Sequence, residues 1–267
     1  MATGQKGTWG KHEAPIRICR WVEIPNQQAP ILVTGSWDKH IKYWDLRTSN
    51  TGPPAADVTC VDRIYTLDSR KSLLVAGLAD RYINIIDLNN PGNIQKTSQS
   101  PLKWQTRVVS CFNDGTGYAV GSIEGRCAIN YIEEKKVSDN FSFRCHRDPR
   151  ESTTTTGIRS TSANQAQDCF SVNAISFHPE HGTFSTAGSN GDFHFWDKDA
   201  KHRLKGYPKV GGSIVSTAFN RTGNIFAYAI SYDWSQGYQG NNQNYPIKVM
   251  LHPVDGEEAK PRPKKGR

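Results

Sequence analysis

Short segments of alternating hydrophobic and polar residues recur along this chain, each following a hydrophobic run and a turn that usually contains glycine. In the segment FHFWD, Phe193 and Phe195 lie on one face of a predicted strand. His194 and Trp196 lie on the other face, because successive side chains of a strand point to opposite sides. Gly191 precedes the segment and supplies the positive φ that a tight hairpin turn needs. The pattern predicts antiparallel β-hairpins whose two faces must both be covered.

This hairpin pattern occurs five times at nearly regular spacing. When its central small residues are aligned, they are separated by 42, 44, 67 and 41 residues. Three of these four intervals match the period of about 40–45 residues that is typical of WD-repeat blades. The copies are ILVTGSWDKHIKYWD (Ile31–Asp45), LLVAGLADRYINIID (Leu73–Asp87), YAVGSIEGRCAINYI (Tyr118–Ile132), TFSTAGSNGDFHFWD (Thr183–Asp197) and NIFAYAISYDW (Asn224–Trp234).

The repeats predict an all-β fold, a WD-repeat β-propeller, because a small sheet cannot cover its own two apolar faces and must stack on its neighbours. The propeller is expected over residues 12–253, after an unmatched N-terminal segment, 1–11. The long interval contains a polar, Ser/Thr-rich stretch, so we expect a flexible insertion over 148–168. The sequence does not decide whether the Ser and Thr residues of 151–162 are phosphorylated. A basic tail, 254–267, is expected after the propeller.

A buried hydrogen-bonded cluster is expected in the first repeat, where it would tie a loop to its blade. Its members would be His12, Asp38, Trp44 and either Ser36 or Thr34. The other repeats lack the complete set. The cluster is therefore expected once, in a structural role.

Seven segments together resemble the mRNA-export WD-repeat family. A mitotic-checkpoint propeller of the Bub type shares several of them, whereas FWDKDA and the SYDWSxG segment favour the export family. The segments are GSWDKHIKYWDLR (Gly35–Arg47), PLKWQTR (Pro101–Arg107), GSIEGR (Gly121–Arg126), FSFRCHR (Phe141–Arg147), SVNAISFHPEHGTF (Ser171–Phe184), FWDKDA (Phe195–Ala200) and GNIFAYAISYDWSQG (Gly223–Gly237).

The resembled family builds a seven-bladed ring, whereas five blades are recognisable in this chain. The resemblance therefore implies that about two N-terminal blades are missing and that the propeller is an open arc. An open arc would expose two sheet edges and two apolar blade faces.

The resemblance also implies a peptide site on the propeller face. In the family, this face binds a GLEBS segment of an FG nucleoporin, and an acidic residue of that segment meets the arginine of SIEGR, here Arg126. Arginine suits this role because its planar guanidinium group binds a carboxylate through two parallel hydrogen bonds. Arg147, at the end of FSFRCHR, is a second candidate. The alternative for both is an ordinary solvated surface arginine.

The resemblance also implies a second candidate surface, for single-stranded RNA or an mRNP, because the family's single-stranded RNA groove includes the segment that follows the FWDKDA turn. Cations neutralise phosphates and aromatic rings stack on bases without reading their sequence. Trp196 also matches the inward-packed tryptophan of the repeat, which makes the cations the better candidates. Five more cations lie in the tail KPRPKKGR (Lys260–Arg267) and suit nuclear entry, phosphate binding or simple solubility. The candidate RNA-binding residues are Lys198, Lys201, Arg203, Lys205 and Trp196.

Composition adds limits to this picture. The formal net charge of +8 favours acidic partners. The six cysteines are scattered singly, which suggests small buried hydrophobic residues rather than disulfides or a metal site. Neither a secretory signal nor a membrane span is recognisable, so we expect an intracellular protein of the nucleus, the nuclear pore complex and the cytoplasm.

Catalysis is the competing class of function. The sequence contains no P-loop, GxSxG or HExxH motif, and His178 and His181 lie in a Pro/Gly turn that matches a family loop. We expect no enzyme activity, cofactor or metal, although propellers can host enzymes. Two adaptor functions remain: mRNA export at the nuclear pore, or spindle-checkpoint signalling through the GLEBS-type segment of a checkpoint kinase.

Overall fold

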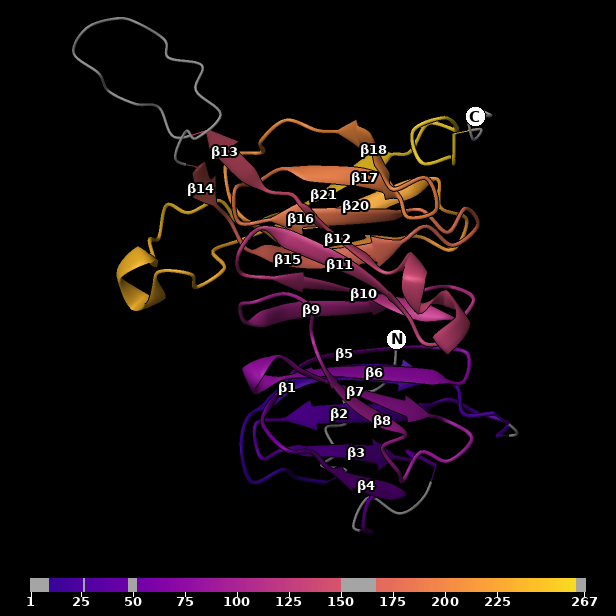
Figure 1. The fold of residues 1–267 in the computed structure, drawn as a ribbon. Coiled ribbons are helices and arrows are strands. Elements are labelled where there is room, and N and C mark those ends of the chain that lie inside the picture. Colours follow the sequence, from indigo (N-terminus) through magenta and orange to yellow (C-terminus); the bar gives the residue numbers. More distant parts are fainter. Residues whose placement is uncertain (1–9, 26, 48–51, 150–166, 263–267) are drawn as a thin grey trace, which may run out of the picture. The chain divides into compact units, whose positions relative to one another are not determined.

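The computed structural model describes residues 10–25, 27–47, 52–149 and 167–262, and their strands form five main antiparallel sheets (Figure 1). The chain divides into a first unit, residues 1–120 and 128–142, and a second unit, residues 121–127 and 143–267. Each of the five recognised repeats lies in a separate sheet, as predicted. We refer to the sheets as blades 1 to 5 in chain order.

Blades 1, 2 and 3 each contain four strands that pair in chain order, so that each strand bonds to the next. A 3₁₀-helix, η1 (Ala79–Arg81), lies in the central turn of blade 2, and η2 (Glu134–Asp139) joins the last two strands of blade 3. The strands are β1 (Ile16–Val22), β2 (Ile31–Ser36), β3 (His40–Trp44) and β4 (Ala56–Thr59); β5 (Ile64–Arg70), β6 (Leu73–Leu78), β7 (Tyr82–Asp87) and β8 (Lys96–Gln99); and β9 (Thr106–Cys111), β10 (Gly117–Ser122), β11 (Arg126–Tyr131) and β12 (Phe141–Arg144).

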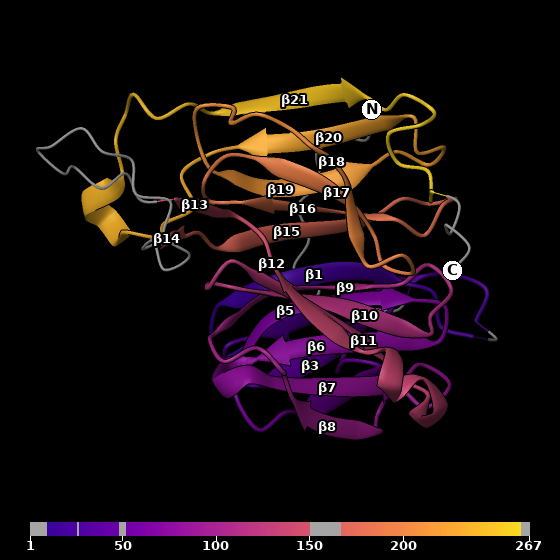
Figure 2. The ribbon, with the colours of Figure 1, turned by 45° about the horizontal axis from the view of Figure 1, so that its top comes forward.

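Blades 4 and 5 lie in the second unit, where blade 4 has four strands and blade 5 has three (Figure 2). A two-stranded ribbon precedes blade 4, and η3 (Gly237–Gly240) lies between the last two strands of blade 5. The strands are β13 (Arg147–Pro149) and β14 (Gln167–Cys169) in the ribbon; β15 (Val172–Phe177), β16 (Phe184–Gly188), β17 (Phe193–Asp197) and β18 (His202–Gly206); and β19 (Ile214–Phe219), β20 (Ile225–Ile230) and β21 (Lys248–Pro253).

Blade 2 shows why the blades of the first unit must stack. Successive residues of β6 point to opposite faces, and each face belongs to a different hydrophobic cluster. Leu74 packs in a cluster with Ile41 of blade 1, whereas Val75 packs in a cluster with Val109 of blade 3. All four side chains are at most 3% exposed. Neither face of the sheet could be covered by the sheet itself.

Aromatic side chains join blades 4 and 5 in the second unit. Phe193 and Phe195 of β17 lie 5.0 and 5.3 Å from Phe226 of β20, between ring centroids. Phe195 also contacts Phe219 of β19 at 5.7 Å. Phe193, Phe195 and Phe226 are at most 2% exposed, so this aromatic cluster is the core between the two blades.

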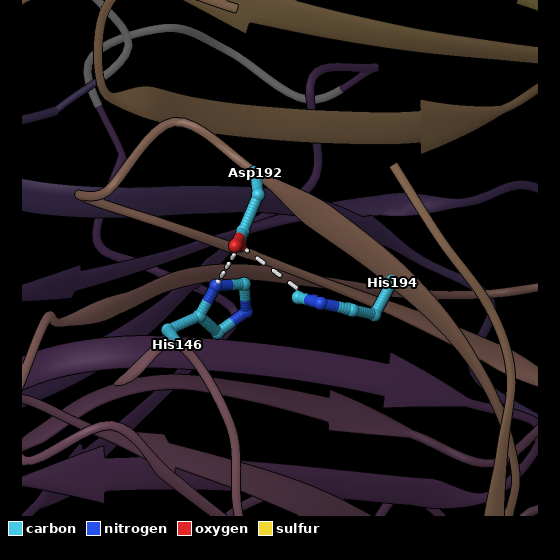
Figure 3. Close-up of side chains that lie close together, drawn as sticks. All are labelled: His146, Asp192 and His194. Atoms are coloured by element: carbon cyan, nitrogen blue, oxygen red, sulfur yellow. Dashed lines mark hydrogen bonds and ion pairs between the residues drawn. The ribbon is translucent and has the colours of Figure 1, made fainter. Parts of the chain in front are cut away.

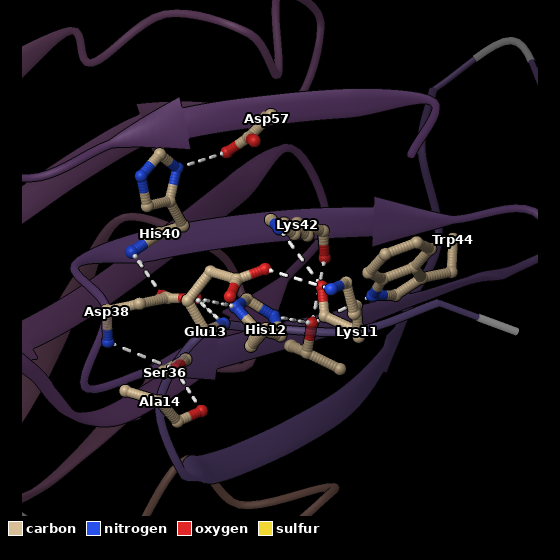
Figure 4. A network of polar contacts seen from close by, with 11 residues as sticks. Lys11, His12, Glu13, Ala14, Ser36, Asp38, His40, Lys42, Trp44 and Asp57 are labelled. Atoms are coloured by element: carbon tan, nitrogen blue, oxygen red, sulfur yellow. Dashed lines mark hydrogen bonds and ion pairs between the residues drawn. The ribbon is translucent and has the colours of Figure 1, made fainter. Parts of the chain in front are cut away.

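The hydrogen-bonded cluster predicted for blade 1 is confirmed (Figure 4). His12 contacts the Asp38 carboxylate through Nδ1 at 2.7 Å and the Thr34 hydroxyl through Nε2 at 2.8 Å. Trp44 donates from Nε1 to the same hydroxyl at 2.8 Å. Thr34 is therefore the hydroxyl member, while Ser36 donates to the Ala14 carbonyl. Burial lowers the pKa of His12 below its ordinary value, although Asp38 opposes that shift.

Several expectations about the chain outside the repeats need correction. The insertion expected to be flexible over 148–168 begins and ends in the paired β13–β14 ribbon, where Asp148 pairs with Asp168. Its remainder, 150–166, including the Ser/Thr stretch 151–162, lies outside the described residues, as do 1–9 and 263–267. The missing N-terminal blades implied by the family comparison are not supported, since the strands that we describe form five blades between Ile16 and Pro253.

The cysteines differ from the expectation in part. Cys60, Cys111, Cys127 and Cys145 are buried, whereas Cys19 and Cys169 are exposed. Among the described residues, no helix is long and apolar enough to cross a membrane.

The C-terminal segment packs against the blades as far as the structure describes it. Ala259 is 2% exposed, and its carbonyl accepts a hydrogen bond from Thr183 at 2.6 Å. The Glu258 carboxylate accepts hydrogen bonds from Lys205 and from the Tyr207 hydroxyl, the latter at 2.7 Å. It also lies 2.9 Å from Nε2 of His252. The start of the expected basic tail is thus a docked segment.

Glu258 should make the second unit sensitive to acid. Burial alone would raise the pKa of Glu258, but hydrogen bonds from Lys205, His252 and Tyr207 lower it to about 2. A lowered pKa contributes stability above the unfolded value near 4.5, and this contribution is lost as the pH falls toward 2. We expect the stability advantage of the parent over Glu258→Gln to shrink between pH 4.5 and 2 in urea unfolding. The neighbouring Glu257→Gln, at a side chain that is 88% exposed, is the control and should show no such change.

Candidate functional site

The turn between β10 and β11 carries the SIEGR motif and is fixed by a glycine. Gly125 has φ +64°, and a Cβ there would lie 2.7 Å from the Cys145 carbonyl oxygen and 2.9 Å from that of His146. Only glycine combines this backbone conformation with so close an approach. The turn therefore lies directly against the segment that begins the β13–β14 ribbon.

Both arginines predicted for peptide binding lie at this turn. Arg147 donates from Nη2 to the Glu124 carbonyl at 2.9 Å and from Nε to the Gly125 carbonyl at 3.4 Å. Arg126 Nε lies 3.8 Å from the Glu124 carboxylate, and its side chain is 30% exposed. The apolar side chain of Ile123, in the same turn, is 40% exposed. The turn thus presents a guanidinium group and an apolar side chain together.

A pocket of about 230 Å³ lies beside the ribbon, entirely within the second unit. Arg147, predicted for peptide binding, and Arg203 and Trp196, predicted for RNA, all line it. Sequence reasoning had assigned them to two separate surfaces. The other lining residues, which it did not single out as binding residues, are Arg144, Cys145, His146, Gln167, Asp192 and His194.

Trp196 is held in the pocket wall from two sides. Its Nε1 donates to the Thr186 hydroxyl at 2.9 Å, and its ring lies 4.5 Å from the Phe143 ring at an interplanar angle of 47°. Arg203 of β18 is its direct cross-strand partner, next to a register shift in β17–β18. The ring is half-buried, so part of Trp196 and the exposed Arg203 face the pocket together.

The three lysines predicted for RNA binding have different surroundings. Lys198 is only 11% exposed and contacts Asp199 at 2.8 Å. Lys205 pairs with Glu258 and lies 5.2 Å from the centre of the Tyr207 ring. Lys201 is exposed in the β17–β18 turn. None of the three lines the pocket.

Blade 4 contains a second complete hydrogen-bonded cluster, so the expectation of a single cluster was wrong. His146 contacts Asp192 through Nδ1 at 2.6 Å and Thr186 through Nε2 at 2.9 Å. Trp196 completes the set through its bond to Thr186. Two features hid the cluster in the sequence: the ribbon separates His146 from the repeat, and Asn190 occupies the position that matches Asp38, with the carboxylate two residues later.

Burial also sets the charge of His194, whose imidazole lies beside this cluster. Burial lowers the pKa of His194 to about 4. The nearby Asp192 carboxylate would raise that pKa, whereas His146 and Arg203 lower it further. Burial would raise the pKa of Asp192, but contacts with His146, His194 and Asn190 together outweigh it and hold that pKa below its ordinary value. His194 is therefore neutral and Asp192 ionised near pH 7.

Comparison with known proteins identifies the same WD repeat and shows which relatives this chain resembles. The family model "WD domain, G-beta repeat" matches residues 5–45 and 160–197. The chain is 61% identical over 263 residues to "mRNA export factor GLE2" of Chaetomium thermophilum, covering 98% of this chain and 69% of that protein. It is 54% identical over 267 residues to "Poly(A)+ RNA export protein" of Schizosaccharomyces pombe, covering 100% and 71%. The chain belongs to the mRNA export factor family. Another member, "Protein Rae1" of Drosophila melanogaster, is 40% identical over 98% of this chain and 72% of its own length.

A solved structure supports the fold of this export-factor chain. The "Crystal Structure of Mitotic Checkpoint Complex" contains a chain that matches with a TM-score of 0.64 and 14% identity, over 84% of this chain and 60% of that one. Identity this low supports the blade architecture alone. The family assignment rests on the export-factor relatives.

Proposed function

We propose that this member of the mRNA export factor family is a binding adaptor in mRNA export and has no enzymatic activity. It would bind the GLEBS segment of an FG nucleoporin at the SIEGR turn, and single-stranded RNA or an mRNP at the arginine-lined pocket. It would work at the nuclear pore complex, in the nucleus and in the cytoplasm. The observation that carries this proposal is that Arg147 takes part in both the SIEGR turn and the pocket.

Exposed apolar side chains support the peptide half of the proposal. In an antiparallel blade, the turn between its second and third strands and the connection to the next blade lie at the same end of the sheet. In the first unit, Trp37 (42%), Val61 (56%) and Trp104 (60%) are exposed at such ends. In the second unit, Trp234 (60%) and Tyr238 (78%) are exposed in the corresponding loop of blade 5. Exposed aromatic residues of this kind mark protein-binding surfaces.

The charge and shape of the pocket support the RNA half. Arg144 and Arg203 are exposed at its mouth and can neutralise phosphates, while Trp196 offers an aromatic edge. Because the Lys198 side chain is only 11% exposed and pairs with Asp199, we assign it a smaller share of phosphate binding than Arg203.

We therefore expect Arg203→Ala to weaken single-stranded RNA binding equally for all sequences. It should lower the slope of log affinity against log salt by about 0.7, the value for one phosphate contact with a single strand. Lys198→Ala should change the slope less. Fluorescence anisotropy across a salt series measures both slopes, and Arg221→Ala, at an exposed arginine of the β19–β20 turn that does not line the pocket, is the matched control. A slope equal to that of the parent in Arg203→Ala would remove the pocket from the RNA site.

The adaptor function itself is tested by titrating the protein with three ligands. They are a GLEBS peptide of an FG nucleoporin, the GLEBS-type peptide of a checkpoint kinase, and a single-stranded RNA oligonucleotide. We expect the nucleoporin peptide and the RNA to bind. Preference for the kinase peptide together with no RNA binding would instead assign the chain to checkpoint signalling.

A further inference from the structure

Blades 1 and 4 contain the same hydrogen-bonded cluster, but blade 4 departs from it in two ways (Figures 3 and 4). In blade 1, the carboxylate of Asp38 lies six residues before Trp44, and the residue two before that tryptophan is Lys42. In blade 4, the carboxylate belongs to Asp192, only four residues before its tryptophan, and the residue two before that tryptophan is His194. The cluster of blade 1 forms without a carboxylate at the first of these positions or a histidine at the second.

The two changes place one carboxylate between two imidazoles. Asp192 Oδ1 lies 2.6 Å from His146 Nδ1 and 3.6 Å from His194 Nδ1 (Figure 3). His194 as a whole is 9% exposed, and its Nδ1 is buried without a hydrogen-bond partner among the described residues. A buried polar nitrogen without a partner costs stability unless something else satisfies it. His194 Nδ1 thus lies near the same carboxylate that His146 contacts.

We propose that His146, Asp192 and His194 form a binding site for a divalent transition-metal ion, with Zn²⁺ as the best fit. One ligand atom from each residue lies within 4.8 Å of the other two. Two imidazoles and a carboxylate form a donor set that zinc takes in proteins, with bonds of about 2.0–2.2 Å. Tetrahedral bonds of that length place neighbouring ligand atoms about 3.3 Å apart, so the His146–Asp192 contact of 2.6 Å must open by about 0.7 Å.

The surroundings of the site suit a bound metal ion. His146 Nε2 lies 2.9 Å from the Thr186 hydroxyl, which also accepts a hydrogen bond from Trp196. A ligating imidazole needs such a partner for its second nitrogen, since the partner fixes the ring orientation and the tautomer. Gly206, opposite His194, leaves room for that ring, because a Cβ there would lie 2.9 Å from His194 Cδ2.

The pocket leaves the fourth ligand position accessible and favours an anion there. His146, Asp192 and His194 all line the pocket, together with Arg144, Arg147 and Arg203. Three guanidinium groups oppose a bare dication, and an anionic fourth ligand such as chloride reduces this repulsion. We therefore expect a zinc site with three protein ligands and one exchangeable ligand.

Equilibrium competition between the full chain and a chromophoric zinc chelator tests the proposal, in a phosphate-free chloride buffer. We expect one Zn²⁺ per chain, and Co²⁺ in its place should give the strong visible absorption of tetrahedral coordination. His194→Gln should lower zinc affinity by about 100-fold or more, because losing a partner outside the ligand set alone costs about 10–100-fold. The side-chain Nδ1 of His194 makes no hydrogen bond with the described residues, so this variant should keep its fold, which far-ultraviolet circular dichroism checks.

Asp192→Asn provides a second variant, and it should lose zinc to a similar extent. His12→Gln disturbs the matching cluster of blade 1 and is the control, since that cluster has no second imidazole. We expect it to bind zinc as the parent does. No zinc binding by the folded parent, or equal affinity in parent and His194→Gln, would overturn the proposed site.

Discussion

Replacing Arg126 with alanine is expected to weaken binding of the GLEBS peptide by about 2–5 kcal/mol, the usual cost of removing one partner from a charge pair that a complex buries. In the free protein Arg126 is 30% exposed and lies 3.8 Å from Glu124, a distance at which the pair is weak. An acidic peptide residue could therefore take over the guanidinium group at little expense. Isothermal titration calorimetry gives the difference directly.

The control for this prediction removes one positive charge as well, but at a position away from the SIEGR turn. Arg221→Ala removes an exposed arginine from the β19–β20 turn, far along the blade from the loops that carry exposed aromatic residues. It should bind the peptide within about 0.5 kcal/mol of the parent, as expected for a surface change away from the site. If Arg126→Ala and Arg221→Ala gave the same affinity, Arg126 would be an ordinary surface arginine.

Phe195→Ala is expected to destabilise the second unit by about 3–5 kcal/mol, the usual cost of truncating a buried phenylalanine. Phe195 is 1% exposed and contacts Phe219 and Phe226 of blade 5. Its removal leaves a cavity in the core between two blades, which those rings cannot fill without losing their own contacts. Urea unfolding measures the change. Trp234→Ala removes a comparable ring that is 60% exposed and should change the free energy of unfolding by less than about 0.5 kcal/mol.

Equal destabilisation by Phe195→Ala and Trp234→Ala would mean that the blades do not depend on a shared core. The second unit would then depend more on its polar contacts, such as the hydrogen-bonded cluster of blade 4.

The inner strands of the blades could be predicted from the sequence because they are apolar on both faces. The repeat at Ile31–Asp45 contains β2 and β3, and the repeat at Thr183–Asp197 contains β16 and β17. The outermost strands gave no comparable signal. For example, β8, the last strand of blade 2, has the sequence KTSQ and is largely exposed. Backbone pairing along a sheet edge, which leaves little trace in hydrophobicity, defines such strands.

The candidate site was harder to predict than the fold because its members are brought together by pairing between distant segments. Arg147 was recognised from its motif, but its neighbour in the pocket, Gln167, follows a long interval that the β13–β14 ribbon closes. Asp192 was missed because it stands two residues beyond the expected position. Sequence also could not show that Lys198 and Lys205 pair with Asp199 and Glu258.

One crossed titration tests the adaptor account most directly. The parent, Arg126→Ala and Arg203→Ala are each titrated with the GLEBS peptide of an FG nucleoporin and with single-stranded RNA. The account predicts that Arg126→Ala loses peptide affinity by about 30-fold or more, equivalent to about 2 kcal/mol, and keeps its RNA affinity. It predicts the reverse selectivity for Arg203→Ala. A folded parent that binds neither ligand, or two variants that match the parent with both ligands, would contradict it.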